Sequence, residues 1–198
     1  MGKRSREIAA RRDEPTLTER YYGPQRSFGM AGVVVGALVL CIALIGLAVW
    51  ATMRQPKEEL IAEIGDTFEI QGQQHIEVGA AHDPYNSNPP TSGPHYVTPS
   101  APGIYDTELA DETLVHNLEH GYVWISYKPG SVDEETIKNI ANLARPYTKV
   151  IVTARSANDT PIAVASWGKL LKLDSYDQLK IKSFIVANRF KAPEPDAP

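Results

Sequence analysis

Residues 111–127 read DETLVHNLEHGYVWISY, and they join a predicted helix directly to a predicted central strand. Gly121 follows the helical stretch 111–120 in the position where helices commonly end, because glycine adopts the left-handed conformation with little strain. Residues 122–127 are almost wholly apolar, which favours a strand covered on both faces. A short helix and a buried strand are therefore expected to meet at Gly121.

The predicted helix has two chemically different faces. At 100° per residue, His116 and His120 share one face and Glu119 lies beside them. Leu114 and Leu118 fall on the opposite side, where they can anchor the helix to a core. We therefore expect the imidazoles to point away from that core and to face another element.

The segment upstream of this helix is rich in proline. Residues 83–106, DPYNSNPPTSGPHYVTPSAPGIYD, hold six of the chain's 15 prolines. Proline lacks an N–H and restricts φ, which excludes a helix or a central strand here. The aromatic residues of the segment offer surface to pack, so an ordered, rigid loop is expected. Ordered loops longer than about 12–15 residues are usually functional.

Two imidazoles four residues apart on a helix can present two nitrogens to one metal ion, which then needs further ligands. All five histidines lie between positions 75 and 120, and the loop carries candidates for those further ligands, with Asp83 also available. The predicted ligands are His82, His95, His116, Glu119 and His120. Residues 51–198 contain no cysteine and one methionine, so Zn²⁺, Cu²⁺, Ni²⁺ or Fe²⁺ fits better than Cu⁺.

Three alternatives to a metal site without catalytic activity remain open. The histidines could serve only as hydrogen-bonding groups that hold the loop. The pattern His-x-x-Glu-His also matches inverted zinc proteases, with Glu119 as general base, although few residues follow for a downstream ligand. Finally, the loop could form the contact surface of a metal-free interaction module, since aromatic residues dominate interfaces. The candidate contact residues are Tyr85, Asn88, Tyr96 and Tyr105.

Downstream of the central strand, the pattern predicts further alternation of helix and strand. A capping box of Ser131 and Glu134 opens a helix to about Ala144. Strands are expected at 149–155 and 162–167, joined as an antiparallel hairpin, and Asp174 is expected to cap a last helix. Together with short strands near 67–70 and 75–78, this order predicts an α/β (α+β) sandwich. A thioredoxin-like arrangement fits the order, with a generic α+β sandwich as the alternative.

Cysteine count and charge exclude several classes of protein. The single cysteine, Cys41, rules out a disulfide scaffold and a Cys-x-x-Cys redox site, so a thioredoxin-like domain here would lack the usual thiols. The net charge of −4 argues against nucleic acid as a partner, because such proteins carry a basic stripe. Because residues 51–198 contain no cysteine, any chemistry in that part of the chain must rely on histidine and carboxylate.

Residues 28–50, FGMAGVVVGALVLCIALIGLAVW, contain 23 consecutive positions without a charge. About 20 apolar residues span a bilayer as a helix. Residues 1–27 carry seven Lys or Arg and four Asp or Glu, whereas residues 51–198 carry 13 and 20. Within about 20 residues of the apolar stretch, four arginines precede it (Arg11, Arg12, Arg20 and Arg26), and only Arg54 and Lys57 follow it. The positive-inside rule then predicts a cytoplasmic N-terminus and a single pass through the plasma membrane. A cleaved signal peptide is not expected, because its apolar region would be shorter.

This topology divides the chain into five predicted parts. They are a basic cytoplasmic tail (1–27), a transmembrane helix (28–50), a juxtamembrane linker (51–60), an extracytoplasmic globular domain (61–190) and a flexible tail (191–198). The lipid bilayer is thus one expected partner, and other subunits of a membrane complex are another.

The motifs SNPPTSGPHY (87–96) and LVHNLEHGYV (114–123), after an N-terminal apolar span, resemble an uncharacterised bacterial family known as a domain of unknown function. The resemblance covers roughly residues 60–190. It implies a membrane-anchored envelope protein with an outward-facing domain, and it implies no activity or cofactor. The predicted function is binding of a divalent metal in metal handling or a redox accessory role, without a predicted enzymatic activity.

Overall fold

The computed structural model describes residues 29–53, 60 and 64–197. The chain divides into two compact units, Met1–Lys57 and Glu58–Pro198, which are described separately. The predicted tail 1–27, Phe28 and most of the predicted linker 51–60 lie outside the described residues.

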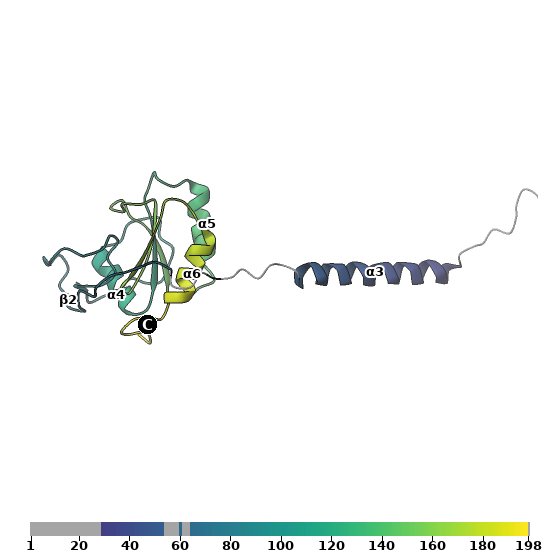
Figure 1. The fold of residues 1–198 in the computed structure, drawn as a ribbon, viewed down its shortest axis with the longest axis horizontal. Coiled ribbons are helices and arrows are strands. Elements are labelled where there is room, and N and C mark those ends of the chain that lie inside the picture. The colour runs from purple at the N-terminus through teal and green to yellow at the C-terminus, as the bar shows by residue number, and fades with distance from the viewer. Residues whose placement is uncertain (1–28, 54–59, 61–63, 198) are drawn as a thin grey trace, which may run out of the picture. The chain divides into compact units, whose positions relative to one another are not determined.

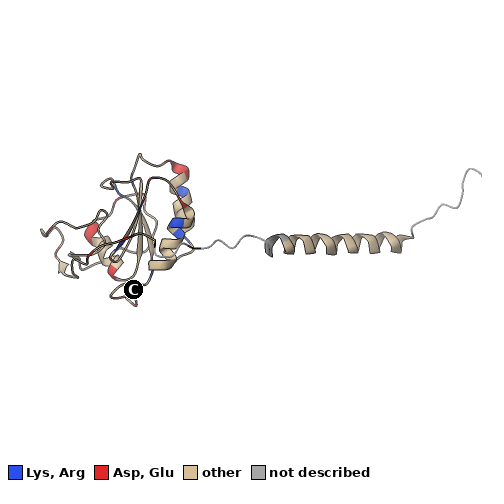
Figure 2. Cartoon of the chain, in the orientation of Figure 1, with Lys and Arg blue, Asp and Glu red and all other residues tan. Residues whose placement is uncertain are grey.

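The described part of the first unit is the helix α3 (Met30–Met53). It contains no charged residue, and the coloured part of this helix is tan throughout in Figure 2. Its 24 residues correspond to a length of about 36 Å. Residues Met30–Trp50 are long and apolar enough to cross a membrane, a criterion of length and composition that a signal sequence near an N-terminus also meets.

The second unit is built on a five-stranded sheet with the order β1-β7-β6-β4-β5. Strand β4 pairs with β5 in parallel and with β6 in antiparallel, and β7 pairs antiparallel with both β6 and β1. The strands are β1 (Asp66–Thr67), β4 (Val123–Tyr127), β5 (Val150–Ala154), β6 (Ile162–Ser166) and β7 (Lys169–Leu173). This mixed architecture, with four helices in the described residues, confirms the predicted α+β class.

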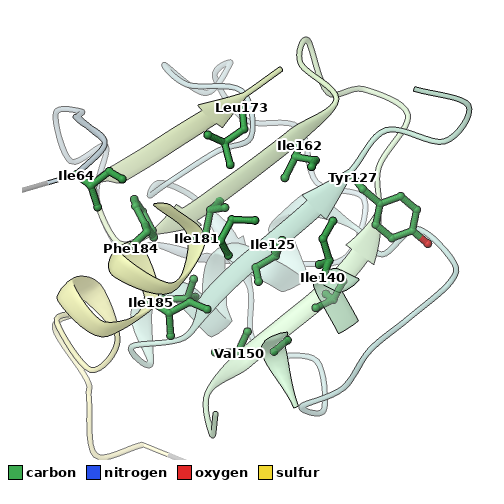
Figure 3. Close-up of a cluster of buried hydrophobic side chains, with 14 of the residues drawn as sticks. Ile64, Ile125, Tyr127, Ile140, Val150, Ile162, Leu173, Ile181, Phe184 and Ile185 are labelled. Carbon is green, nitrogen blue, oxygen red and sulfur yellow. The ribbon is translucent and has the colours of Figure 1, made fainter. Parts of the chain in front are cut away.

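Helices cover both faces of the sheet (Figure 1). Helices α5 (Glu134–Ala144) and α6 (Gln178–Asn188) lie on one face, and α4 (Asp111–Glu119) lies on the other. Alternate residues of β4 point to opposite faces, as expected for a strand. Ile125 packs beneath α5 and α6 with Ile140 and Phe184 (Figure 3), whereas Trp124 belongs to the cluster beneath α4.

The predicted hairpin of strands 149–155 and 162–167 is wrong. Strand β4 lies between β5 and β6, because the helical crossover through α5 returns β5 parallel to β4 on its outer side. The hairpin partner of β6 is β7, a strand that the sequence analysis did not predict. Ser166 pairs with Lys169 across a two-residue turn, in which Gly168 has a φ of +68°.

The predicted N-caps of the two long helices are also wrong. Helix α5 is capped by Asp133, whose carboxylate accepts from the Thr136 N–H, and not by Ser131. Helix α6 is capped by Asp177, which accepts from the Lys180 N–H, and not by Asp174. The predicted end of α5 at Ala144 is confirmed.

Candidate metal centre

Helix α4 carries one half of the site, and its two faces behave as the sequence predicts. Leu114 and Leu118 are fully buried in the cluster that contains Trp124. On the other face, His116 and Glu119 are also buried, at 4% and 2% exposure. Because the leucines anchor one face to the sheet, the opposite face is presented to the segment upstream.

The C-terminus of α4 places the second histidine of the pair. His120 is the C-cap residue and is 7% exposed. Gly121 follows with a φ of +78°, and its N–H donates to the Leu118 carbonyl. The predicted termination at Gly121 is confirmed, since this conformation favours glycine.

Two short strands carry the other half of the site. Strands β2 (His75–Ile76) and β3 (His95–Tyr96) form a separate two-stranded parallel sheet, in which His75 pairs with His95. The His95 N–H donates to the Gln74 carbonyl at 2.9 Å. The pairing brings two imidazoles from positions 20 residues apart to ring centroids 4.8 Å apart.

The histidines His75, His95, His116 and His120, with Glu119, form one group, the histidine cluster. The His116 ring lies at its centre. Its centroid is 4.9 Å from that of His75, 5.0 Å from His95 and 4.5 Å from His120. His95 is fully buried, whereas the His75 side chain is 47% exposed. Solvent therefore reaches the cluster on the His75 side.

Backbone carbonyls determine which ring nitrogen faces the cluster. His116 Nδ1 lies 2.6 Å from the Tyr96 carbonyl, and His95 Nδ1 lies 2.8 Å from the Gly93 carbonyl. A carbonyl oxygen can only accept, so both Nδ1 atoms carry the proton. In the neutral rings, the lone pair is then on Nε2, which in each case points at the other members of the cluster.

The Glu119 carboxylate is part of the cluster. Its Oε2 lies 3.0 Å from His95 Nε2 and 3.9 Å from His75 Nε2, with the side chain 3% exposed. A carboxylate oxygen and an Nε2 lone pair are both acceptors, so their contact at 3.0 Å needs a proton or a metal cation between them. The site is thus suited chemically to a cation.

Two overlapping sets of side chains could hold a metal ion. They are His75, His95 and His116, and His116, Glu119 and His120. Within each set, one ligand atom per residue lies within 4.8 Å of the others. Ligands around a tetrahedral Zn²⁺ with Zn–N of about 2.0–2.1 Å lie about 3.3 Å apart, so small side-chain shifts would close either set around an ion.

Burial lowers the pKa of the His116 imidazole. The neighbouring His120, His95 and His75 act in the same direction, and the hydrogen bond to Tyr96 opposes them. Burial and the neighbouring imidazoles thus both disfavour the imidazolium form of His116. The lowered pKa favours the neutral imidazole, which is the form that coordinates a metal.

The structure brings together four of the five predicted ligands: His95, His116, Glu119 and His120. His82 lies elsewhere, with Nδ1 2.7 Å from the Asp83 carbonyl and Nε2 3.3 Å from Glu112. His75, which is not among the predicted ligands, joins the cluster instead. The one signal for it was the concentration of all five histidines in residues 75–120.

The predicted contact residues of the loop are half-buried and mostly hold the loop itself. Tyr85 Oη donates to the Pro94 carbonyl at 2.6 Å, and Tyr105 Oη donates to the Ala101 carbonyl at 2.7 Å. Tyr96 Oη accepts from the Gly79 N–H. Asn88 accepts from Arg155 at 2.5 Å and donates to the Ala157 carbonyl, which ties the loop to the end of β5.

Asn117 of α4, which the sequence analysis did not select, fastens the loop to the helix. Its amide donates to the Ser100 carbonyl and accepts from the Ser100 N–H, both at 2.9 Å. The loop and α4 are thus joined next to the cluster that they build together.

The comparisons with known proteins place this unit in a family. The model of the family described as "Protein of unknown function (DUF3105)" matches residues 78–198. This range includes the whole cluster except His75. No curated protein and no solved structure matches the chain.

Proposed function

The chain belongs to the DUF3105 family of proteins of unknown function, and we propose that its C-terminal unit binds a divalent metal ion. The ligands would come from the helix α4 and from the two short strands β2 and β3. At least one ion would be held by nitrogens of the four clustered histidines, His75, His95, His116 and His120, with Glu119 as the neighbouring carboxylate.

The observation that carries the proposal is the orientation of His95 and His116. Both rings donate Nδ1–H to a backbone carbonyl, which leaves Nε2 as the coordinating atom. Metal-ligating histidines almost always make such a second hydrogen bond, which orients the ring and raises its basicity. A cluster of histidines that served only to hold the loop would not need its lone pairs to converge.

Ligand chemistry limits the identity of the ion. Nitrogen and carboxylate oxygen, without sulfur, favour Zn²⁺, Cu²⁺, Ni²⁺ or Fe²⁺ over Cu⁺. A site of this kind, partly open at His75, fits a role in metal handling or as a redox accessory.

For the location, the proposal is a bacterial plasma-membrane protein. Helix α3 would anchor the chain in the lipid bilayer, with the N-terminus in the cytoplasm and the metal-binding unit outside. The uncharged composition of α3 and the excess of Lys and Arg before it support this arrangement. Other subunits of a membrane complex would then be the partners of the outer unit.

The thioredoxin-like description of the fold also remains a proposal. A parallel β4-α5-β5 unit is followed by the antiparallel hairpin β6-β7 and the helix α6. Helices α5 and α6 lie on the same face of the sheet. This order supports the description, although the residues of the unit include no cysteine for thiol chemistry.

Metal content of the full-length chain tests the proposed function. The chain, purified in detergent and equilibrated with zinc, is expected to hold at least one ion, measured by elemental analysis. His116→Ala should weaken zinc binding at least about tenfold, because it removes the central imidazole, and even residues that only orient a ligand contribute about 10–100-fold to metal affinity. His82→Ala is the matched control and should bind like the wild type, since His82 contacts Glu112 rather than the cluster.

Two results would contradict the proposed function. One is a wild-type chain without zinc after equilibration. The other is a His116→Ala variant that is folded by circular dichroism and keeps the wild-type zinc content.

The alternative of a metal-free interaction module is less supported. Its predicted contact residues Tyr85, Tyr96 and Tyr105 are half-buried, and their hydroxyls bind backbone groups of residues 79–101. Such side chains are occupied within the unit and offer less area to a partner.

A further inference from the structure

The segment after α6 contacts the histidine cluster, although a flexible tail is expected there from the sequence. We call residues Phe190–Ala197 the C-terminal strap. The Phe190 N–H donates to the Gly121 carbonyl at 2.9 Å, and the Glu194 N–H donates to the Glu119 carbonyl at 3.1 Å. The backbone of the strap is therefore hydrogen-bonded to the end of α4.

Lys149 ties the strap to α4 a second time. Its Nζ donates to the carbonyls of His120 at 2.8 Å, Pro195 at 3.0 Å and Ala197 at 2.5 Å. The same ammonium lies 5.3 Å from the centroid of the Tyr122 ring. One cation thus bridges the last residue of the cluster and two residues of the strap.

These contacts bring a second carboxylate to the cluster. Glu194 Oε2 lies 3.6 Å from His120 Nε2, which in turn lies 3.0 Å from His116 Nε2. The Glu194 side chain is 58% exposed, so it lies on the solvent side of the buried His120. The cluster then contains four histidines and two carboxylates.

Each imidazole nitrogen can coordinate one ion. This limits how the four histidines and two carboxylates can be divided between metal ions. His116 Nδ1 is occupied by the Tyr96 carbonyl, so His116 has one coordinating atom, Nε2. The two overlapping ligand sets both contain His116 and cannot both use it at once. If His116 and His120 coordinate the same ion, the histidines left for another ion are His75 and His95, which lie next to Glu119 Oε2.

We infer that the cluster is a two-metal centre, with Glu194 of the strap completing the second site. The first ion is held by His75, His95 and Glu119, and the second by His116, His120 and Glu194. Glu119 has two carboxylate oxygens and lies in both surroundings, so it bridges the ions. Paired ions in proteins lie about 3.5–4 Å apart, which suits a bridging carboxylate. This inference rests on the proposed function and adds a second ion and its ligand.

The test counts zinc ions in the full-length chain purified in detergent. Zinc binding is measured by equilibrium dialysis against buffered Zn²⁺, followed by elemental analysis. The wild type is expected to bind two ions per chain. Glu194→Gln should keep the first ion and weaken the second at least tenfold, because it removes a charged ligand and leaves the strap unchanged in size. Asp196→Asn is the matched control, with the same loss of charge in the strap, and should bind two ions like the wild type.

Copper provides a second measurement that a merely structural role of Glu194 would not change. Two Cu²⁺ ions a few ångströms apart couple magnetically, so the loaded wild type should show a coupled signal in electron paramagnetic resonance. Glu194→Gln should show an isolated ion at the same copper concentration.

The outcomes separate this inference from the proposed function. One zinc per chain in the wild type, with unchanged affinity in Glu194→Gln, overturns the two-metal centre and leaves the proposed function intact. Two zinc ions that respond equally to Glu194→Gln and Asp196→Asn also overturn the role of Glu194. A wild-type chain without zinc overturns both.

Discussion

The carbonyls of Gly93 and Tyr96 each hold one imidazole of the cluster at Nδ1. A ring held in this way presents Nε2 in a defined direction before any ion is bound. Ordering a side chain has an entropic cost, so ligands that are already oriented bind an ion more tightly. The metal affinity of the proposed site would therefore depend on the loop backbone as well as on the ligands.

Gly121 allows the strap to approach α4, and its replacement should be costly. A Cβ at this position would lie 2.9 Å from Phe190 Cα, and the φ of +78° is unfavourable for other residues. We expect Gly121→Ala to destabilise a fragment of residues 58–198 by at least about 1 kcal/mol more than Gly130→Ala in urea unfolding. Gly130 is the matched control, because it has the same φ of +78° and nothing within 4 Å of its Cβ position. Equal losses in the two variants would mean that the strap does not pack on Gly121.

Single residues also show how far the site could be predicted from the sequence. His116, Glu119 and His120 follow from helical spacing, because Leu114 and Leu118 determine which face is buried. No local pattern of this kind separates His75 from His82. Their difference depends on pairing with a strand 20 residues away, and a two-residue strand has too few side chains to define that register.

Glu194 could not be predicted for a related reason. Residues 191–197 of the strap, KAPEPDA, have no apolar periodicity, which indicates a tail without packing. Its position depends instead on backbone hydrogen bonds to Glu119 and Gly121 and on the ammonium of Lys149. On the strap, all of these contacts are made by backbone N–H and C=O groups, which do not depend on the side chains. The sequence therefore carries no pattern from which they could be predicted.

At the scale of helices and strands, Arg155, the residue after β5, joins α4 to the proline-rich loop. The guanidinium donates to both carboxylate oxygens of Asp111, at 2.8 and 2.6 Å, and to Asn88 Oδ1 at 2.5 Å. Its side chain is 8% exposed. The first residue of α4 and the loop are thus held by one planar group, which presents its donors in a fixed fork.

Replacing Arg155 should therefore loosen both elements. Arg155→Ala leaves Asp111 and Asn88 without their buried partner, and we expect a loss of about 2–3 kcal/mol in the free energy of unfolding. Arg155→Lys should recover less than half of this loss, because an ammonium cannot bind Asp111 through two parallel hydrogen bonds. Urea unfolding of the fragment 58–198 measures both, with Lys138→Ala on the exposed face of α5 as the control. Full recovery by lysine would show that charge alone matters at this position.

The elements themselves were predicted more reliably than their partners. The helix α4, the strand β4 and the end of α5 follow from local patterns of apolar residues and from Gly121. The pairing of β6 was wrong, because the pattern KLLKL of β7 does not alternate and was not recognised as a strand. The caps were wrong because each helix begins after a later Asp, Asp133 instead of Ser131 and Asp177 instead of Asp174, and the sequence alone does not rank the two candidates.

For the whole molecule, charge differs strongly between the parts on either side of α3. Residues 1–27 have an excess of three positive charges, and residues 51–198 have an excess of seven negative charges. An acidic unit attracts cations, which raises their concentration near its surface. This distribution suits the proposed binding of a metal cation by the acidic unit. The proposed orientation rests instead on the four arginines that precede the apolar helix within about 20 residues, against Arg54 and Lys57 after it.

Labelling of single cysteines tests this orientation, because Cys41 is the chain's one cysteine and can be replaced by alanine. In that background, Ser175→Cys introduces an exposed thiol in the C-terminal unit, and Ser5→Cys introduces one in the N-terminal segment. In intact cells, a membrane-impermeant maleimide should label Cys at 175 and should leave Cys at 5 unlabelled until the membrane is permeabilised. The wild-type Cys41 should stay unlabelled in both conditions, because it lies within the apolar helix α3. Labelling at position 5 but not at 175 in intact cells would reverse the orientation. Recovery of the Ser175→Cys chain in the soluble fraction would instead identify α3 as a removed signal sequence.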